Sequence, residues 1–453
     1  MVSVYISALE GKMAIEEKRL MYIFPILVFM YVILVGLFVQ TILLPYLIPS
    51  AHYGEGILNG TDTIYFHEES KKLAKEISLY GWSRWSLKPE GQIMIGITSL
   101  IYVLTGIYKP YVMLFYNALL HSLSALFLMK LLTNYGISIK YAIFGILPLV
   151  FFPSNLMWIS QIHRDGLYIL GFLAFFLSIS YIHKKGYKTL LYSLFLQAFG
   201  LFLIYLAREH MVLPFKYVFS FLFVVSLLFL ALKFIGLFKE NLLVERQVLS
   251  RFTVLAFAVV IVSSILAPQT QTQTQTQTQT QTQTQIKWEK EIFVPEKIDK
   301  ILYNIAVWRY MFLNVYFKDA KGNIEQDFIP QKASDFLLYL PRGLYVGLFY
   351  PTPEFWFKEG GTTGGTVARA IIPFETVVVW IGIIGFVFAF YNLPNRFSIL
   401  IILLLCLMFI YLHVITEPNL GPIVRKRYVF ISMLIGFSYS YLIWRLSLWL
   451  KRA

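Results

Sequence analysis

The sequence contains a series of apolar runs that are each about 20 residues long. A helix of that length crosses the roughly 30 Å hydrocarbon core of a bilayer. The runs occupy residues 20–47, 112–132, 141–159, 166–182, 190–207, 211–232, 252–267, 371–391, 397–414 and 428–444. The sequence therefore predicts an all-α, polytopic membrane protein with about ten transmembrane helices.

The composition excludes a soluble globular protein. Hydrophobic residues make up 58% of the chain and charged residues 14%, against about 45–50% and 25% in soluble proteins. The single cysteine, Cys406, excludes an intrachain disulfide and a cysteine metal cluster. We assign the net charge of +14 to the cytoplasmic loops of a membrane protein, and we expect no nucleic-acid partner.

The apolar run at residues 93–108 is only 16 residues long and contains two glycines. Whether it crosses the membrane decides the side on which every later loop lies. If it does not cross, the basic loops at 183–188 and 233–251 share the side of Lys18 and Arg19, as the positive-inside rule requires. We therefore predict a re-entrant or interfacial helix there. The chain is then expected to lie in the plasma (inner) membrane with both termini in the cytoplasm.

Two long segments, 48–110 and 268–370, are then expected to face the outside. The second opens with a Gln-Thr repeat, which has no apolar face to bury and is predicted to be a flexible linker. The stretch 335–350 contains a proline and two glycines, so we expect it to dip into the interface and not to cross. The predicted organisation is a transmembrane module at 1–267, a linker at 268–285, a small outer-face cap at 286–370 and a transmembrane module at 371–453.

Asp62 lies just beyond the first predicted span, in the sequence NGTDTIYFHEES. Ionisable residues at membrane depth are costly and are therefore functional candidates by default. A carboxylate at the mouth of a helix bundle can act as a general base on a hydroxyl nucleophile. The alternative is that Asp62 only caps the helix that follows, because Asp is a good N-cap residue.

A second set of ionisable residues lies in two short outer loops. His163, Arg164 and Asp165 precede the fourth predicted span, and Arg208 lies in LAREHMVLP after the fifth. Both loops face the side of Asp62, so the two carboxylates can converge on one cavity. The alternative for Arg208 is an ordinary exposed turn.

A third basic group, Arg425-Lys426-Arg427, enters the last predicted span from the outside, against the positive-inside trend. A phosphate is a natural partner, because arginine stays charged and binds two phosphate oxygens at once. Pairing with Glu417 or with lipid head groups is the alternative. Two positions on a helix differ by about 200° of rotation, so only one of the two arginines can face the bundle, and we expect Arg427 to do so.

This layout resembles the integral membrane glycosyltransferases of the GT-C superfamily, such as protein mannosyltransferases and the aminoarabinose transferase of lipid A. The resemblance rests on Asp62 in GTDTIY, on KPEGQIMIGITSLIYVLTG as an interfacial helix, and on Asp165 in HRDG. Arg425 and Arg427 resemble the family's basic residues in placement. The resemblance implies a GT-C-like fold and a polyprenyl-phosphate-linked sugar as donor. It identifies no metal ligands, and a divalent metal is left open as a cofactor.

The predicted function is transfer of a sugar from a polyprenyl-phosphate carrier to a glycan, lipid or protein acceptor on the outer (periplasmic) face. Asp62 is the predicted base, and Asp165 orients the acceptor or supports Asp62. Arg164, Arg208, Arg425 and Arg427 are predicted to bind the carrier phosphate. No nucleotide-binding motif is present. The alternatives are a flippase or transporter of a lipid-linked sugar, an O-antigen polymerase or ligase, and a non-catalytic assembly subunit.

Overall fold

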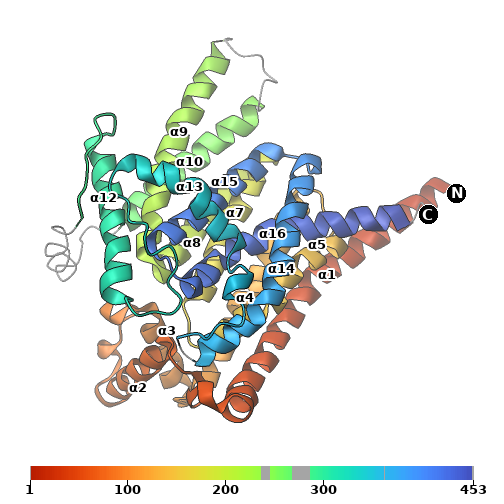
Figure 1. The fold of residues 1–453 in the computed structure, drawn as a ribbon. Coiled ribbons are helices and arrows are strands. Elements are labelled where there is room, and N and C mark those ends of the chain that lie inside the picture. The colour runs from red at the N-terminus through yellow and green to blue at the C-terminus, as the bar shows by residue number, and fades with distance from the viewer. Residues whose placement is uncertain (1, 236–244, 268–285, 362, 451–453) are drawn as a thin grey trace. The chain divides into compact units, whose positions relative to one another are not determined.

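The computed structural model describes residues 2–235, 245–267, 286–361 and 363–450 (Figure 1). The chain forms two compact units. Unit 1 contains residues 1–267, 382–402 and 432–453, and unit 2 contains residues 268–381 and 403–431. The segment 371–453 is therefore shared between the two units. The predicted Gln-Thr linker at 268–285 lies outside the described residues.

Helices make up most of the described chain. Before the linker they are α1 (Val2–Phe38), η1 (Val39–Leu47), α2 (Asp62–Tyr80), α3 (Ile93–Thr105), α4 (Leu114–Asn134), α5 (Ile139–Phe151), α6 (Pro153–Ile159), α7 (Asp165–Ser180), α8 (Tyr187–Ala207), α9 (Val212–Phe234) and α10 (Arg246–Leu266). After it come α12 (Glu296–Met311), α13 (Ala333–Phe349), α14 (Thr363–Asn392), α15 (Arg396–Thr416) and α16 (Leu420–Leu450). Two short strands, β1 (His52–Gly54) and β2 (Ile57–Leu58), form an antiparallel hairpin.

Nine helices of the described chain are long and apolar enough to cross a membrane. They coincide with nine of the predicted runs, and they confirm an all-α, multi-pass membrane protein. The predicted run at 141–159 is instead a pair of helices, α5 and α6, bent by 62° at the break between them.

The α5–α6 pair runs alongside α1. At its start, Ser138 donates a hydrogen bond to Glu17 (2.6 Å), and at its end, the Ser160 carbonyl accepts one from Gln40. Residues 17 and 40 of a helix are separated by about 35 Å, so the two contacts lie near opposite ends of the apolar part of α1, as one bent span requires. Tyr141, also at the start of α5, hydrogen-bonds to Ser447 near the end of α16 (2.7 Å). The first and last spans therefore have their terminal ends on the same side, as an even number of crossings requires.

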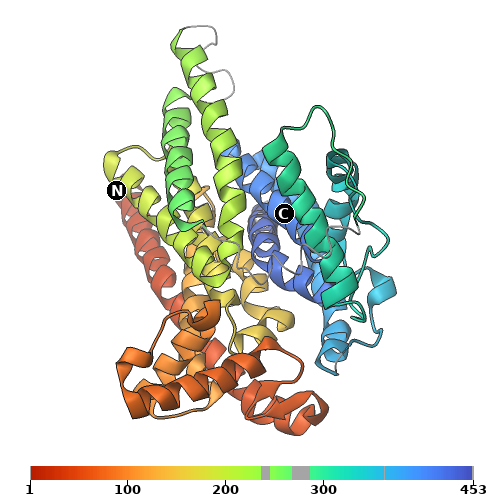
Figure 2. The same ribbon diagram turned by 90° about the vertical axis from the view of Figure 1, so that its left-hand side faces the viewer.

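The segment between the first two spans forms a layer at one end of unit 1 (Figure 2). It contains the β-hairpin, α2 and α3. The α3 helix was predicted as a helix too short to cross, and at 13 residues it is about 20 Å long. It packs on α2, because Ser70 of α2 donates to the Ile95 carbonyl (3.3 Å). Trp85 also holds α3 through the Gly96 carbonyl (3.0 Å).

Unit 1 is built around α7, most residues of which are buried. Gly200 of α8 faces Gly171 of α7, and a Cβ atom at Gly200 would lie 2.6 Å from the Gly171 carbonyl oxygen. The two helices therefore pack backbone to backbone, as small residues allow in membrane proteins. The α7 helix is consequently a rigid support for the residues at its first turn.

Unit 2 is held together by Arg309, which is fully buried in α12. Its guanidinium donates to the carbonyls of Glu325 and Phe328 and, at the end of α15, to those of Val414 and Ile415. These carbonyls satisfy a charged group that would be costly to bury alone.

Candidate functional site

The loop at residues 160–164, between α6 and α7, is fixed by buried amide side chains. Gln161 accepts a hydrogen bond from the Leu58 amide (3.0 Å) and donates to the Gly56 carbonyl (3.1 Å). Asn117 of α4 donates to the carbonyls of Ile159 and Gln161 (2.7 and 2.8 Å). The loop is therefore tied to the β-hairpin and to α4, and it is not a wetted turn.

Asp165 is the first residue of α7, and its side chain is buried. One carboxylate oxygen accepts a hydrogen bond from Arg208 (3.0 Å), and the other lies 3.0 Å from Nδ1 of His163. Arg208 is also buried and lies over the ring of Tyr168, 5.6 Å from its centroid. The alternative that Arg208 belongs to an exposed turn is therefore wrong. Its neighbours Glu209 and His210 are exposed, and Glu209 pairs with Lys88 (3.2 Å).

A small cavity lies beside Asp165 and is lined by Asn117, His121, Ser124 and His163 among others. Its volume is about 10 Å³, which is room for about one water molecule. A sugar does not fit there. Asp62 is not among the lining residues, so the two carboxylates do not share this cavity.

Asp62 is exposed at the first position of α2. The N-cap residue is Thr61, and its hydroxyl donates back to the Leu58 carbonyl (2.9 Å) without capping the helix. Among the described residues, Asp62 has no hydrogen-bond or ion-pair partner. The next residue, Thr63, donates to the Ile162 carbonyl (3.3 Å). The first turn of α2 therefore touches the loop that leads into Asp165.

Arg164 and the three basic residues of α16 have different environments. Arg164 is half-buried at the N-cap of α7. In unit 2, Arg427 is buried and donates to the carbonyls of Gly347 and Tyr350 at the end of α13. Lys426 pairs with Glu417, whereas Arg425 is half-buried. The predicted phosphate ligand Arg427 is thus engaged by protein carbonyls in this structure.

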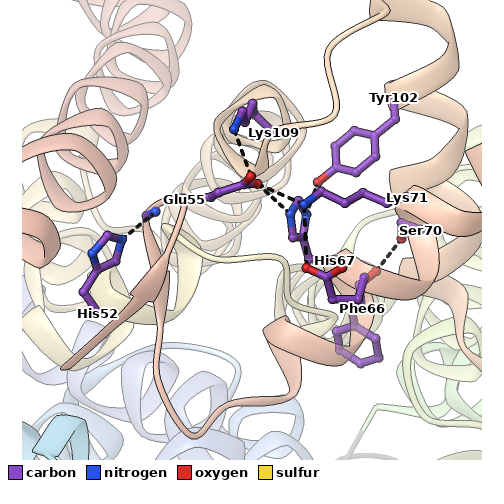
Figure 3. Close-up of polar contacts among 10 residues, drawn as sticks. His52, Glu55, Phe66, His67, Ser70, Lys71, Tyr102 and Lys109 are labelled. Atoms are coloured by element: carbon purple, nitrogen blue, oxygen red, sulfur yellow. Dashed lines mark hydrogen bonds and ion pairs between the residues drawn. The ribbon is translucent and has the colours of Figure 1, made fainter. Parts of the chain in front are cut away.

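The sequence prediction missed a buried network centred on His67 of α2 (Figure 3). The His67 side chain is 1% exposed. Its Nδ1 lies 2.6 Å from the hydroxyl of Tyr102 in α3, and its Nε2 lies 2.9 Å from the Glu55 carboxylate. Burial lowers the pKa of the imidazole, so the neutral form is favoured at neutral pH.

Glu55 occupies the tip of the β-hairpin with a left-handed backbone (φ +53°). Its carboxylate pairs with Lys109 (2.9 Å) and Lys71 (3.2 Å) as well as His67. Partial burial by itself raises the pKa of Glu55, but the hydrogen bonds from Lys109, His67 and Lys71 outweigh it and hold the pKa at about 2. Such a carboxylate is a weak base, and its role is to fasten the hairpin to α2 and to the segment that leads into α4. The sequence feature that could have predicted this hairpin is the pair of glycines around Glu55, because a two-residue hairpin turn needs positive φ values.

No group of three His, Cys, Asp or Glu residues in the described part of the chain is close enough to hold a metal ion. Asp62 is therefore an exposed carboxylate beside the loop that leads into Asp165, and the charge of Asp165 is neutralised by Arg208. Comparison with known proteins adds no further assignment, because no protein family model, curated protein or solved structure matches this chain.

Proposed function

We propose that this protein is a membrane glycosyltransferase of the GT-C type. It moves a sugar from a polyprenyl-phosphate carrier to a glycan, lipid or protein acceptor. The observation that carries the proposal is the exposed carboxylate of Asp62 on the helical turn that touches the Asp165 loop. A general base needs a carboxylate that can reach an acceptor hydroxyl, and Asp62 meets that requirement.

Asp165 has a different role in this proposal. Its charge is neutralised by Arg208, and it lies against a cavity too small for a sugar. Of the two roles predicted for it, support of the Asp62 region fits this geometry better than contact with the acceptor. Arg164 lies next to it at the N-cap of α7, so we assign the first contact with the carrier phosphate to Arg164. The phosphate role of Arg425 and Arg427 stays a prediction.

The test is donor turnover by the full chain in lipid nanodiscs. A panel of polyprenyl-phosphate-linked sugars would be supplied, and the released polyprenyl phosphate would be measured. Asp62→Asn keeps the shape but cannot accept a proton, so turnover should fall by about 10²–10⁴. Glu76→Gln is the matched control, because Glu76 is an exposed carboxylate on the same helix. Equal turnover in both variants would overturn the proposal.

A flippase or transporter of lipid-linked sugars is the second candidate. The broken α5–α6 span favours it, because interrupted helices often line transport sites. The two functions predict different fates for a labelled lipid-linked sugar. A transporter would move a labelled lipid-linked sugar across a vesicle membrane without releasing polyprenyl phosphate.

The proposed orientation places both termini in the cytoplasm and the Asp62 layer outside. Cysteines at two exposed positions, Ser78→Cys and Lys188→Cys, test it in intact cells. A membrane-impermeant maleimide should label the first and not the second. The reverse pattern would place Asp62 in the cytoplasm and contradict a periplasmic reaction.

A further inference from the structure

The α13 helix has an apolar side that the described part of unit 2 leaves uncovered. Leu337 and Leu338 are 73% and 76% exposed, and Tyr345 is 42% exposed. These positions, together with Pro341, share one side of the helix, because residues three or four apart lie above one another. Arg342 borders this side, where it is 49% exposed, pairs with Glu325 (2.7 Å) and lies over the Tyr345 ring. The sequence prediction treated this stretch as interrupted, but the structure runs through Pro341 as one continuous helix.

The opposite side of α13 packs on α15, one of the membrane-length helices. Gly343 and Gly347 form a G-x-x-x-G pattern on that side. A Cβ atom at Gly343 would lie 2.7 Å from the Tyr411 ring, and one at Gly347 would clash with Ile410. The Tyr411 hydroxyl also donates to the Phe336 carbonyl (2.6 Å). Close backbone approach at paired small residues is the packing mode of helices within membranes.

The C-terminal end of α13 supplies an independent observation. The last carbonyls of a helix have no partner within it and are normally satisfied by water or by a cap. Here Arg427 of α16 binds the carbonyls of Gly347 and Tyr350, and Trp380 of α14 donates to that of Phe349 (3.0 Å). Both donors come from membrane-length helices, and Trp380 lies well inside α14. Satisfying a helix end with protein donors is required where water is absent.

We propose that α13 is a re-entrant membrane helix whose Leu337, Leu338 and Tyr345 side lies against lipid acyl chains. With 17 residues it is about 25 Å long, which is short of a full crossing. Arg427 and Trp380 therefore end the helix within the membrane and return the chain to the outside. This assignment concerns the lipid contact of unit 2, and it stands whether or not the protein transfers sugars.

Site-directed spin labelling in reconstituted bilayers tests the proposal. The single native cysteine is removed by Cys406→Ala, and a label is placed at Leu338→Cys. Val224→Cys on α9 serves as the lipid-facing reference, and Glu359→Cys serves as the water-facing reference, since both positions are exposed. The label at 338 should collide with oxygen more than with a water-soluble nickel complex, as the label at 224 does. A profile like that at 359 would mean that the surface faces water or a protein partner, and it would overturn the proposal.

A second measurement keeps the test independent of the Cys406 substitution. Cys406 is fully buried, so the wild-type chain gives the background rate for a water-soluble maleimide. The thiolate is the reactive form, and an apolar environment suppresses it. Maleimide should therefore label Leu338→Cys at least about tenfold more slowly than Glu359→Cys. Equal rates at the two positions would contradict the lipid contact.

Discussion

The loop after the first transmembrane helix and the loop before α7 each bring a carboxylate to the same side of unit 1. Their surroundings are opposite. Asp165 is buried and neutralised by Arg208 with His163 beside it, whereas Asp62 is exposed and unpaired among the described residues. A paired, buried carboxylate is engaged by its partners, and removing one partner leaves a costly buried charge. An exposed one is available for chemistry. In the proposed reaction, the comparison therefore assigns the supporting role to Asp165 and the chemical role to Asp62.

The largest effect is expected at the Asp165 ion pair. Arg208→Met removes one partner and leaves a buried, uncompensated carboxylate, which should cost about 3–5 kcal/mol in the free energy of unfolding. Thermal denaturation in nanodiscs measures this loss. The double variant Asp165→Leu with Arg208→Met should recover much of it, because no buried charge is then left unpaired. A single variant as stable as the wild type would mean that the pair does not hold the loop.

A smaller effect is expected at the network that fastens the first loop. Tyr102→Phe deletes the hydroxyl that lies 2.6 Å from the buried His67, which should lower the free energy of unfolding by about 1–3 kcal/mol. Tyr108→Phe is the matched control, since its hydroxyl makes an exposed contact with Ser78 (3.3 Å). Equal melting temperatures for the two variants would show that the His67 network does not stabilise the layer.

The pH dependence of stability also tests the network of Glu55 and His67 that fastens the first loop. The pKa of Glu55 is lower in the folded protein, about 2 against an ordinary value of 4.5, so the unfolded state binds more protons between these values. Its stabilisation is therefore present above about pH 4.5 and is lost as the pH falls toward 2. The lowered pKa of His67 acts in the same direction below about pH 6.5. Melting curves from about pH 7 to about pH 2.5 should show falling stability, and Glu55→Gln should flatten the part of that fall below about pH 4.5.

The transmembrane helices could be predicted because a bilayer demands about 20 apolar residues from each span. That local rule located nine helices and the length of the α5–α6 pair. It could not reveal the bend between α5 and α6, nor the continuity of α13 through Pro341. Those features depend on neighbouring helices and not on local composition.

The partners of the site residues were less predictable. Asp165 and Arg208 are 43 residues apart in sequence, and Glu55, His67 and Tyr102 come from a turn and two helices. Each residue type has many compatible partners, so one sequence does not select among them. Asp62 was predicted because it stands close to the end of a span, whereas its exposure is seen only in the structure. The burial of Arg427 against carbonyls at the end of α13 likewise depends on tertiary packing.

The central claim is that Asp62 acts chemically and that Asp165 acts structurally. Turnover per folded molecule and melting temperature, measured together for Asp62→Asn and Asp165→Asn, test it most directly. We expect Asp62→Asn to lower turnover by about 10²–10⁴ with a stability change within about 0.5 kcal/mol. Asp165→Asn should lower the melting temperature while the remaining folded molecules keep most of their turnover. Loss of turnover in folded Asp165→Asn, with normal turnover in Asp62→Asn, would contradict the account.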